Sequence, residues 1–205
     1  MDSKFNSADY WEKRYAKGRN SGAGSYDNLA AFKAEVLNDF VAANAIETVV
    51  EFGCGDGNQL KLAQYPRYLG VDVSPTIIAL CRRLFAEDIT KSFVEVSEYS
   101  GTRAELSLSL DVIYHLVEDQ VFDTYMRTLF AAGTRFVIIY SSNMERTPSK
   151  LEHVRHRKFT DWIERNERGF TLKQQIENRY PPRADAQAPG NTEYSYCDFF
   201  IYEAT

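Results

Sequence analysis

One short stretch, from Thr48 to Gly57, constrains the fold of this chain more than any other part of the sequence. Its apolar start, Thr48-Val-Val, predicts an interior parallel strand, and the amphipathic run Asn58–Ala63 that follows it predicts a helix. Three glycines lie in the connection, at positions 53, 55 and 57. Residues without a side chain adopt backbone angles that others cannot, and they leave backbone N–H groups open to a ligand. The stretch therefore predicts a strand, a ligand-binding loop and a helix in succession.

The rest of the chain continues this alternation of strands and helices. Apolar runs predict four further parallel strands at 68–73, 92–96, 106–110 and 135–140, the fourth-strand run alternating strictly between leucine and serine. Ser74 and Pro75 are typical of a helix start, and an apolar stripe over 121–130 predicts another helix that ends at Gly133. Two long strands at 170–178 and 194–202, joined by the proline-rich segment 181–189, should pair antiparallel. The predicted fold class is α/β, a doubly wound open sheet of seven strands, mostly parallel with a C-terminal antiparallel hairpin.

Ahead of the first strand, residues 8–17 predict a short helix and residues 29–40 an amphipathic one. The glycine-rich loop 18–25 lies between them, and such a loop either cradles an anion or forms a mobile lid. We favour a lid that contacts the acceptor. Residues 1–205 then form one domain, with 1–26 as its N-terminal helix and lid.

Composition limits the function. The chain has 205 residues, 44% of them hydrophobic and 14% aromatic, which is typical of one globular domain. A net charge of -5 argues against a protein that grips nucleic acid over a wide surface. Three scattered cysteines, a polar N-terminus and the absence of an apolar run long enough to span a bilayer predict a soluble, cytoplasmic protein without a membrane partner.

Two acids at defined spacing narrow the choice of cofactor. Asp72 follows the glycine loop by about 20 positions, at the end of the next strand, where a carboxylate reaches ribose hydroxyls. A dinucleotide-dependent oxidoreductase and an enzyme that uses S-adenosylmethionine both fit this distance. The glycines, however, are spaced G-x-G-x-G with Glu51 two residues ahead of the first. A carboxylate there repels a pyrophosphate and attracts an ammonium or sulfonium group.

At these residues the chain resembles the class I S-adenosylmethionine-dependent methyltransferases, whose first motif is an acidic residue followed by G-x-G-x-G. Tyr10–Tyr15 is similar to the N-terminal helix of the small-molecule members, and Ser109–Leu116 to the segment after their fourth strand. The resemblance covers most of the chain. It implies the seven-stranded fold, S-adenosyl-L-methionine as cofactor and methyl transfer as activity.

The resemblance also implies a set of cofactor-binding positions. The three glycines would face the methionine and ribose parts, Glu51 and Asp56 the amino group, Asp72 the ribose hydroxyls and Val73 the adenine. The complete set is Glu51, Gly53, Cys54, Gly55, Asp56, Gly57, Asp72, Val73, Ser97, Glu98, Leu110 and Asp111. Ser97 and Glu98 equally fit a solvated loop. Nothing in the sequence pairs Cys54 with a base, so it reads as a small filler rather than a nucleophile.

Methyl transfer to a hydroxyl requires alignment of the acceptor and removal of a proton. The candidate catalytic residues are His115, Asp111 and His153. The basic segment Arg146–Lys158 could hold a phosphate or carboxylate of the acceptor, or be a solvated charged loop. Aromatic side chains near the N-terminus could stack on a sugar or ring, or be packing anchors. Candidate substrate-binding residues are Trp11, Tyr15, Tyr26, Arg155 and His156.

The sequence therefore predicts methyl transfer to a small-molecule or glycan acceptor, most simply a hydroxyl, with a sugar on an anionic or nucleotide-linked carrier as one option. A small-molecule N-methyltransferase is the nearest alternative. A non-catalytic docking module and an NAD-dependent oxidoreductase are weaker ones, because the acids and glycines of the cofactor loop are all present. The chain lacks an Asn-Pro-Pro-Tyr type motif, so DNA methylation is not expected, and no residue spacing predicts a metal site.

Overall fold

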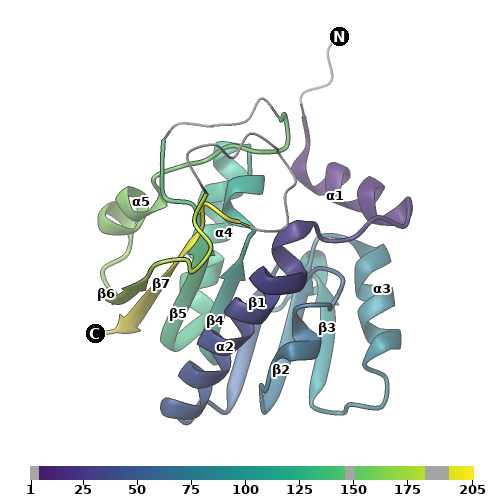
Figure 1. Ribbon diagram of the computed structural model, residues 1–205, viewed down its shortest axis with the longest axis horizontal. Helices are drawn as coiled ribbons and strands as arrows, with labels where there is room; N and C mark the ends of the chain where they lie inside the picture. The colour runs from purple at the N-terminus through teal and green to yellow at the C-terminus, as the bar shows by residue number, and fades with distance from the viewer. Residues whose placement is uncertain (1–4, 146–150, 183–193) are drawn as a thin grey trace.

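A seven-stranded sheet forms the centre of the computed structural model, which describes residues 5–145, 151–182 and 194–205 (Figure 1). The strand order is β3-β2-β1-β4-β5-β7-β6. Strands β1 to β5 pair in parallel, whereas β7 is antiparallel to both β5 and β6. This confirms the predicted α/β sheet. Its strands are β1 Thr48–Phe52, β2 Arg67–Asp72, β3 Lys91–Glu95, β4 Ala104–Leu110, β5 Gly133–Ser141, β6 Phe170–Ile176 and β7 Asp198–Ala204.

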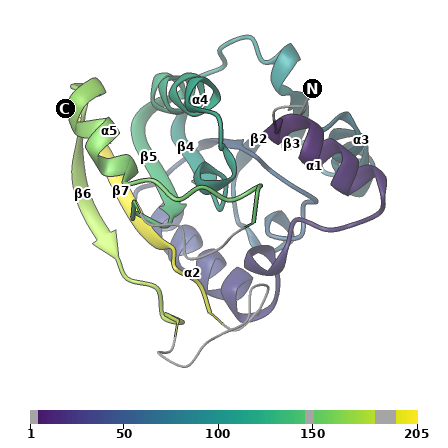
Figure 2. The same ribbon diagram turned by 90° about the horizontal axis from the view of Figure 1, so that it is seen from above.

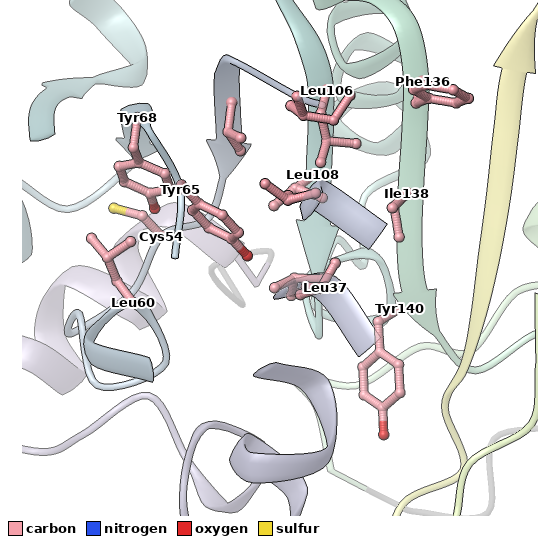
Figure 3. Close-up of a cluster of buried hydrophobic side chains, with 14 of the residues drawn as sticks. Leu37, Cys54, Leu60, Tyr65, Tyr68, Leu106, Leu108, Phe136, Ile138 and Tyr140 are labelled. Carbon is pink, nitrogen blue, oxygen red and sulfur yellow. The ribbon is translucent and has the colours of Figure 1, made fainter. Parts of the chain in front are cut away.

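Helices cover both faces of the sheet. Buried side chains of α2 and α3 form one core layer with the sheet, and those of α4 and α5 form the other. Figure 2 shows α2 and α4 on opposite sides of the sheet, with α1 across one edge. Figure 3 shows part of the first layer, where Leu37 of α2 lies near Leu108 and Tyr140 of the sheet. The helices are α1 Ser7–Ala16, α2 Asp27–Ala43, α3 Pro75–Leu84, α4 Asp119–Ala132 and α5 Phe159–Asn166.

Helix boundaries follow the local signals in the sequence. The Ser74 side chain accepts a hydrogen bond from the Ile77 backbone N–H, and Pro75 occupies the first turn of α3. In the apolar stripe of α4, Phe122, Met126, Leu129 and Phe130 are buried, whereas Val121 is exposed. The helix ends before Gly133, as predicted. In β4 the leucines and the alternating serines are all buried. That strand is covered on both faces, although its alternation is typical of a half-exposed strand.

Three segments differ from the prediction. Asn58–Ala63 does not form a helix of several turns but only the short 3-10 turn η2, Leu60–Leu62, because Pro66 soon follows and the residue before a proline disfavours helical backbone angles. The last strand begins at Asp198, four residues later than expected. Helix α5 was not predicted, although its buried Phe159 and Ile163 have helical spacing. Residues 183–189 of the proline-rich segment lie outside the described residues.

Within the described ranges, none of the helices combines the length and the apolar character needed to cross a bilayer.

Candidate functional site

A cavity of about 910 Å³ opens beyond the carboxyl ends of β1, β2 and β4. Its wall is built from the glycine loop, the end of β2, the segment after β4 and parts of α1, α2 and α4. Figure 1 shows α1 lying across this edge of the sheet. In an open parallel sheet this edge is where ligands bind, and the volume is in the range of small-molecule sites.

The glycine loop turns sharply and lies close to side chains of neighbouring segments. Gly53, Gly55 and Gly57 have φ angles of 82°, 58° and 76°, which favour glycine. A side chain at Gly53 would meet Val112 at 2.4 Å, and one at Gly55 would meet Ser21 at 2.4 Å. The first two glycines line the cavity. Gly57 does not, and packs against an aromatic ring of the α3 end instead.

Two buried carboxylates stand at the base of the cavity. Glu51, in β1, accepts a hydrogen bond of 2.7 Å from the Tyr68 hydroxyl, and burial raises its pKa to about 7. Asp72, at the end of β2, accepts from the backbone N–H groups of Gly55 and Ser74 at 3.1 and 3.0 Å. Burial raises the pKa of Asp72 to about 6 despite these bonds. A positively charged ligand would lower both pKa values and stabilise the ionised forms.

Asp56 holds the lid rather than facing the cavity. Its Oδ2 accepts hydrogen bonds from the Ser21 backbone N–H and from the Tyr26 hydroxyl, each at 2.8 Å, and its own N–H donates to Ser21 Oγ. The Tyr26 hydroxyl is thus bound to Asp56, and burial beside this carboxylate raises the pKa of Tyr26 to about 12. Residues 18–26 are thus fastened to the glycine loop.

The side of the cavity formed by the residues after β2 and β3 is apolar. Val73 lines it. Ser97 and Glu98 are exposed and lie outside it, and Glu98 contacts Arg82 and the backbone of its own turn, η3 Val96–Glu98. The flanking residues Val96 and Tyr99 line the cavity in their place. The predicted pair Ser97 and Glu98 is therefore not part of the cavity wall, and a contact between this segment and a cofactor stays a prediction.

Leu110 and Asp111 close the cavity beyond β4. Asp111 has a φ of 60°, an angle that few residues other than glycine adopt. Its carboxylate accepts from Lys33 Nζ at 2.6 Å and from the Tyr114 hydroxyl at 3.1 Å. Sequence reasoning missed Lys33, although a signal existed. The residue lies four positions from both Leu29 and Leu37, in the buried stripe of α2, where a lysine is unusual.

His115 contacts the cavity from the 3-10 turn η4, Ile113–His115. Its Nδ1 lies 2.9 Å from the carbonyl oxygen of His153. A carbonyl oxygen only accepts, so Nδ1 carries the proton and Nε2 keeps its lone pair. Burial lowers the pKa of His115 well below its ordinary value, which keeps the ring neutral at pH 7. Trp11 packs edge-on against this ring at 4.8 Å.

The basic segment after β5 docks onto the turn that carries His115. The His153 ring stacks on Tyr10 at 4.5 Å and does not line the cavity. His156 is also outside it and pairs with the Ser142 hydroxyl. Arg155 reaches the cavity, yet it contacts Asp119 and the backbone oxygen of Val117, each at 2.9 Å. The expected Arg146 and Lys150 lie outside the described residues.

Helix α1 is fixed over the cavity by polar contacts along its length. Ser7 bonds to Glu118 at the start of α4, and Glu12 accepts from the Ser74 and Thr76 hydroxyls at the start of α3. Tyr15 is buried, lines the cavity and contacts Ser21 Oγ at 3.1 Å. Cys54 is likewise buried beside the cavity, and a contact with the Cys81 thiol together with burial raises the pKa of its thiol, so it is a poor nucleophile.

The parts of the chain that the structure describes contain no group of three or more His, Cys, Asp or Glu side chains able to hold a metal ion.

Known methyltransferases are similar to this chain in sequence or in fold. No protein-family model matches the chain. A small RNA 2'-O-methyltransferase of Arabidopsis thaliana is 27% identical in an alignment of length 134 that covers 57% of this chain. The chain spans only 14% of the length of that relative.

Solved structures extend the likeness to the whole chain. The magnesium protoporphyrin IX methyltransferase of Synechocystis PCC 6803, crystallised with S-adenosylmethionine, has a TM-score of 0.66 at 14% identity and covers 100% of both chains. The N-methyltransferase NodS of Bradyrhizobium japonicum WM9, in complex with S-adenosyl-L-homocysteine, has a TM-score of 0.71 at 16% identity over 98% of this chain and 99% of its own. At these identities the likeness shows a shared fold.

Proposed function

Proceeding from the fold that this chain shares with S-adenosylmethionine-dependent methyltransferases, we propose that it transfers a methyl group from S-adenosyl-L-methionine to an acceptor bound beside α1. The observation that carries the proposal is the pair of buried carboxylates, Glu51 and Asp72, beside a glycine loop that faces a cavity of about 910 Å³. Carboxylates at this place suit a cationic ligand with free hydroxyls and disfavour a pyrophosphate.

The residues present fit this cofactor chemically. Asp72 uses two acceptor positions for the Gly55 and Ser74 N–H groups, and a carboxylate offers about four, so two hydroxyls of a ribose can be bound as well. Val73, Val96 and Tyr99 offer an apolar surface for an adenine. Glu51 supplies negative charge near a sulfonium or ammonium group. When bound, the cofactor supplies a methyl group on a positively charged sulfur.

For an acceptor hydroxyl, the chain must also take up a proton. Among the predicted bases, His115 has the arrangement that this task needs, because its ring is neutral and its unprotonated Nε2 belongs to a side chain in the cavity wall. Asp111 lines the same wall, but its carboxylate is already shared between Lys33 and Tyr114. His153 contributes its backbone oxygen, which holds the His115 ring in place. We therefore assign the base to His115 and a positioning role to the His153 backbone.

The acceptor that this site suits best is a hydroxyl on a small molecule or a glycan. Trp11 presents an aromatic surface beside His115, as expected for stacking on a sugar or ring. An anionic group on the acceptor receives less support, because Arg155 is engaged by Asp119 and Val117. A small amine remains the nearest alternative acceptor, since it needs less help from a base.

A second candidate is the 2'-hydroxyl of an RNA, favoured by the sequence similarity to a small RNA 2'-O-methyltransferase. The net charge of -5 argues for contact with a terminal nucleotide at most, rather than with a long RNA surface. Both candidates use the same site and the same base.

A screen with methyl-labelled cofactor tests these proposals. The acceptors are nucleotide sugars, oligosaccharides, phenols, amines, and RNA oligonucleotides with a free or a blocked terminal 2'-hydroxyl. Label transfer to a sugar or phenol hydroxyl that His115→Ala abolishes is the expected result. Transfer only to amines, with no dependence on His115, would contradict the hydroxyl assignment. Cofactor binding without transfer to any acceptor class would favour the docking-module alternative.

A further inference from the structure

Two buried polar side chains in the cavity wall have no part in the reaction proposed above. Lys33, in α2, is 1% exposed, and its Nζ contacts Asp111 at 2.6 Å and lies 5.2 Å from the centre of the Tyr140 ring. An ammonium group carries three N–H donors. Within the described residues, one of these donors bonds to Asp111, and Nζ makes no other hydrogen bond. Because Lys33 lines the cavity, its remaining donors are available to a ligand.

Gln59 contacts the turn of α2 that carries Lys33. This side chain is 8% exposed and also lines the cavity. Its Nε2 donates to the Ala30 carbonyl at 3.1 Å. Ala30 lies three positions before Lys33 in α2. The Gln59 Oε1 is buried and has no hydrogen-bond partner within the described part of the chain. An unpaired buried oxygen is costly, and a ligand donor would remove that cost.

We infer that Lys33 and Gln59 bind the amino-acid end of the cofactor, with Lys33 on its carboxylate and Gln59 Oε1 on its ammonium group. The inference rests on the proposed function and extends it to residues outside the glycine-loop motif. An amino acid needs one cation and one acceptor near each other. Lys33 belongs to α2, and Gln59 is bound to the same turn of α2 through the Ala30 carbonyl, so both side chains reach the cavity from one place. Lys33 also offsets the charge of Asp111, which would otherwise repel a carboxylate.

Three ligands separate this role from a structural one. S-adenosylhomocysteine carries the complete amino-acid end, its decarboxylated analogue lacks only the carboxylate, and methylthioadenosine lacks both charged groups. Calorimetry on the wild-type chain should show weaker binding of the decarboxylated analogue than of S-adenosylhomocysteine, by roughly 10-fold to 100-fold, the usual worth of a charge-assisted hydrogen bond. Equal affinity for these two ligands would overturn the assignment of Lys33 without any variant.

Variants then test each side chain. Lys33→Met should weaken S-adenosylhomocysteine by roughly 10-fold or more, and leave the decarboxylated analogue and methylthioadenosine within about twofold. Gln59→Leu should weaken the first two ligands and spare methylthioadenosine, and Gln59→Glu should restore them. Lys61→Met, at an exposed lysine two residues beyond Gln59, is the matched control and should change nothing.

Two outcomes have distinct meanings. If Lys33→Met weakens all three ligands equally, Lys33 only supports the fold of the site and the inference is wrong, while the proposed function stands. If the wild-type chain binds none of the three, the proposed function itself fails.

Discussion

The carbonyl oxygen of His153 accepts a hydrogen bond from Nδ1 of His115 across 2.9 Å, so the turn after β4 and the segment after β5 meet beside the cavity. The same segment donates to the turn through the Arg155 backbone N–H, 2.8 Å from the Tyr114 carbonyl oxygen. Because the segment after β5 makes both contacts through its backbone, these two hydrogen bonds do not depend on the side chain at position 153.

We predict that His115→Ala lowers kcat by about 100-fold or more while S-adenosylhomocysteine affinity stays within about threefold, because a general base acts on the acceptor proton. His153→Ala is the matched control. It keeps the carbonyl oxygen that orients His115 and loses the ring contacts with Tyr10 and with the His115 ring, so its kcat should fall far less. The measurement is steady-state kinetics with an acceptor from the label screen, and equal activity of both variants to the wild type would remove His115 as the base.

Asp72→Ala should weaken S-adenosylhomocysteine by about 100-fold, because two hydrogen bonds to a carboxylate are lost at about 1.5 kcal/mol or more each. Asp72→Asn keeps one acceptor oxygen for the Gly55 or Ser74 N–H and serves to separate ribose binding from loop support. Calorimetric titration measures both, with circular dichroism as the check on folding. Unchanged affinity in Asp72→Ala would show that the ribose assignment is wrong.

The raised pKa of Glu51 predicts a pH-dependent stability of the ligand-free chain. Burial raises this pKa from 4.5 to about 7, so the folded state holds the proton more tightly than the unfolded state. The free energy of unfolding therefore falls as pH rises from about 4.5 to 7, and the loss reaches at most about 3 kcal/mol. Glu51→Gln keeps an acceptor for the Tyr68 hydroxyl and removes the charge.

We expect Glu51→Gln to be more stable than the wild type at pH 8 and equally stable at pH 4. Urea unfolding at both pH values measures this, and Glu87→Gln, at an exposed position, should show no such difference. A variant that is less stable than the wild type at pH 8 would mean that the Glu51 carboxylate stabilises the fold, against the burial argument.

Asp56→Ala should release the lid. The Asp56 carboxylate accepts from Ser21 and Tyr26, and its removal breaks both of these contacts with the lid. The bonds from the backbone N–H of residue 56 to Ser21 Oγ and from Asn58 to the Ser25 carbonyl remain. Amide hydrogen exchange in this segment should then quicken by roughly tenfold or more, while β1 and β4 stay protected. Asp39→Ala, on the exposed side of α2, is the control. Unchanged exchange in residues 18–26 of Asp56→Ala would contradict a lid held by this residue.

Sequence reasoning predicted the sheet well because its signals are local. The cap at Ser74, the stripe of α4 and the apolar runs of the strands each act within one element, and the structure follows them. The same holds for the cofactor loop, where the spacing of Glu51 and Asp72 brings both carboxylates to one cavity.

What the sequence did not predict depends on contacts between distant segments. Asp56 faces the lid because Ser21 and Tyr26 arrive from 30 or more residues away. Arg155 forms an ion pair with Asp119, which lies 36 positions earlier in the sequence, and the two charges cancel. A count of basic residues does not reveal this ion pair. Lys33 lines the cavity because its helix packs on the sheet and brings Nζ to Asp111 after β4, although a lysine in an apolar stripe could have been noticed.

The central claim is that this cavity binds an adenosyl cofactor with a charged amino-acid end. Calorimetric titration of the purified chain with S-adenosylhomocysteine and, separately, with NADH tests it most directly. We predict saturable one-to-one binding of S-adenosylhomocysteine and no binding of NADH, because Glu51 attracts the first and repels the pyrophosphate of the second. Binding of NADH without binding of S-adenosylhomocysteine would contradict the account.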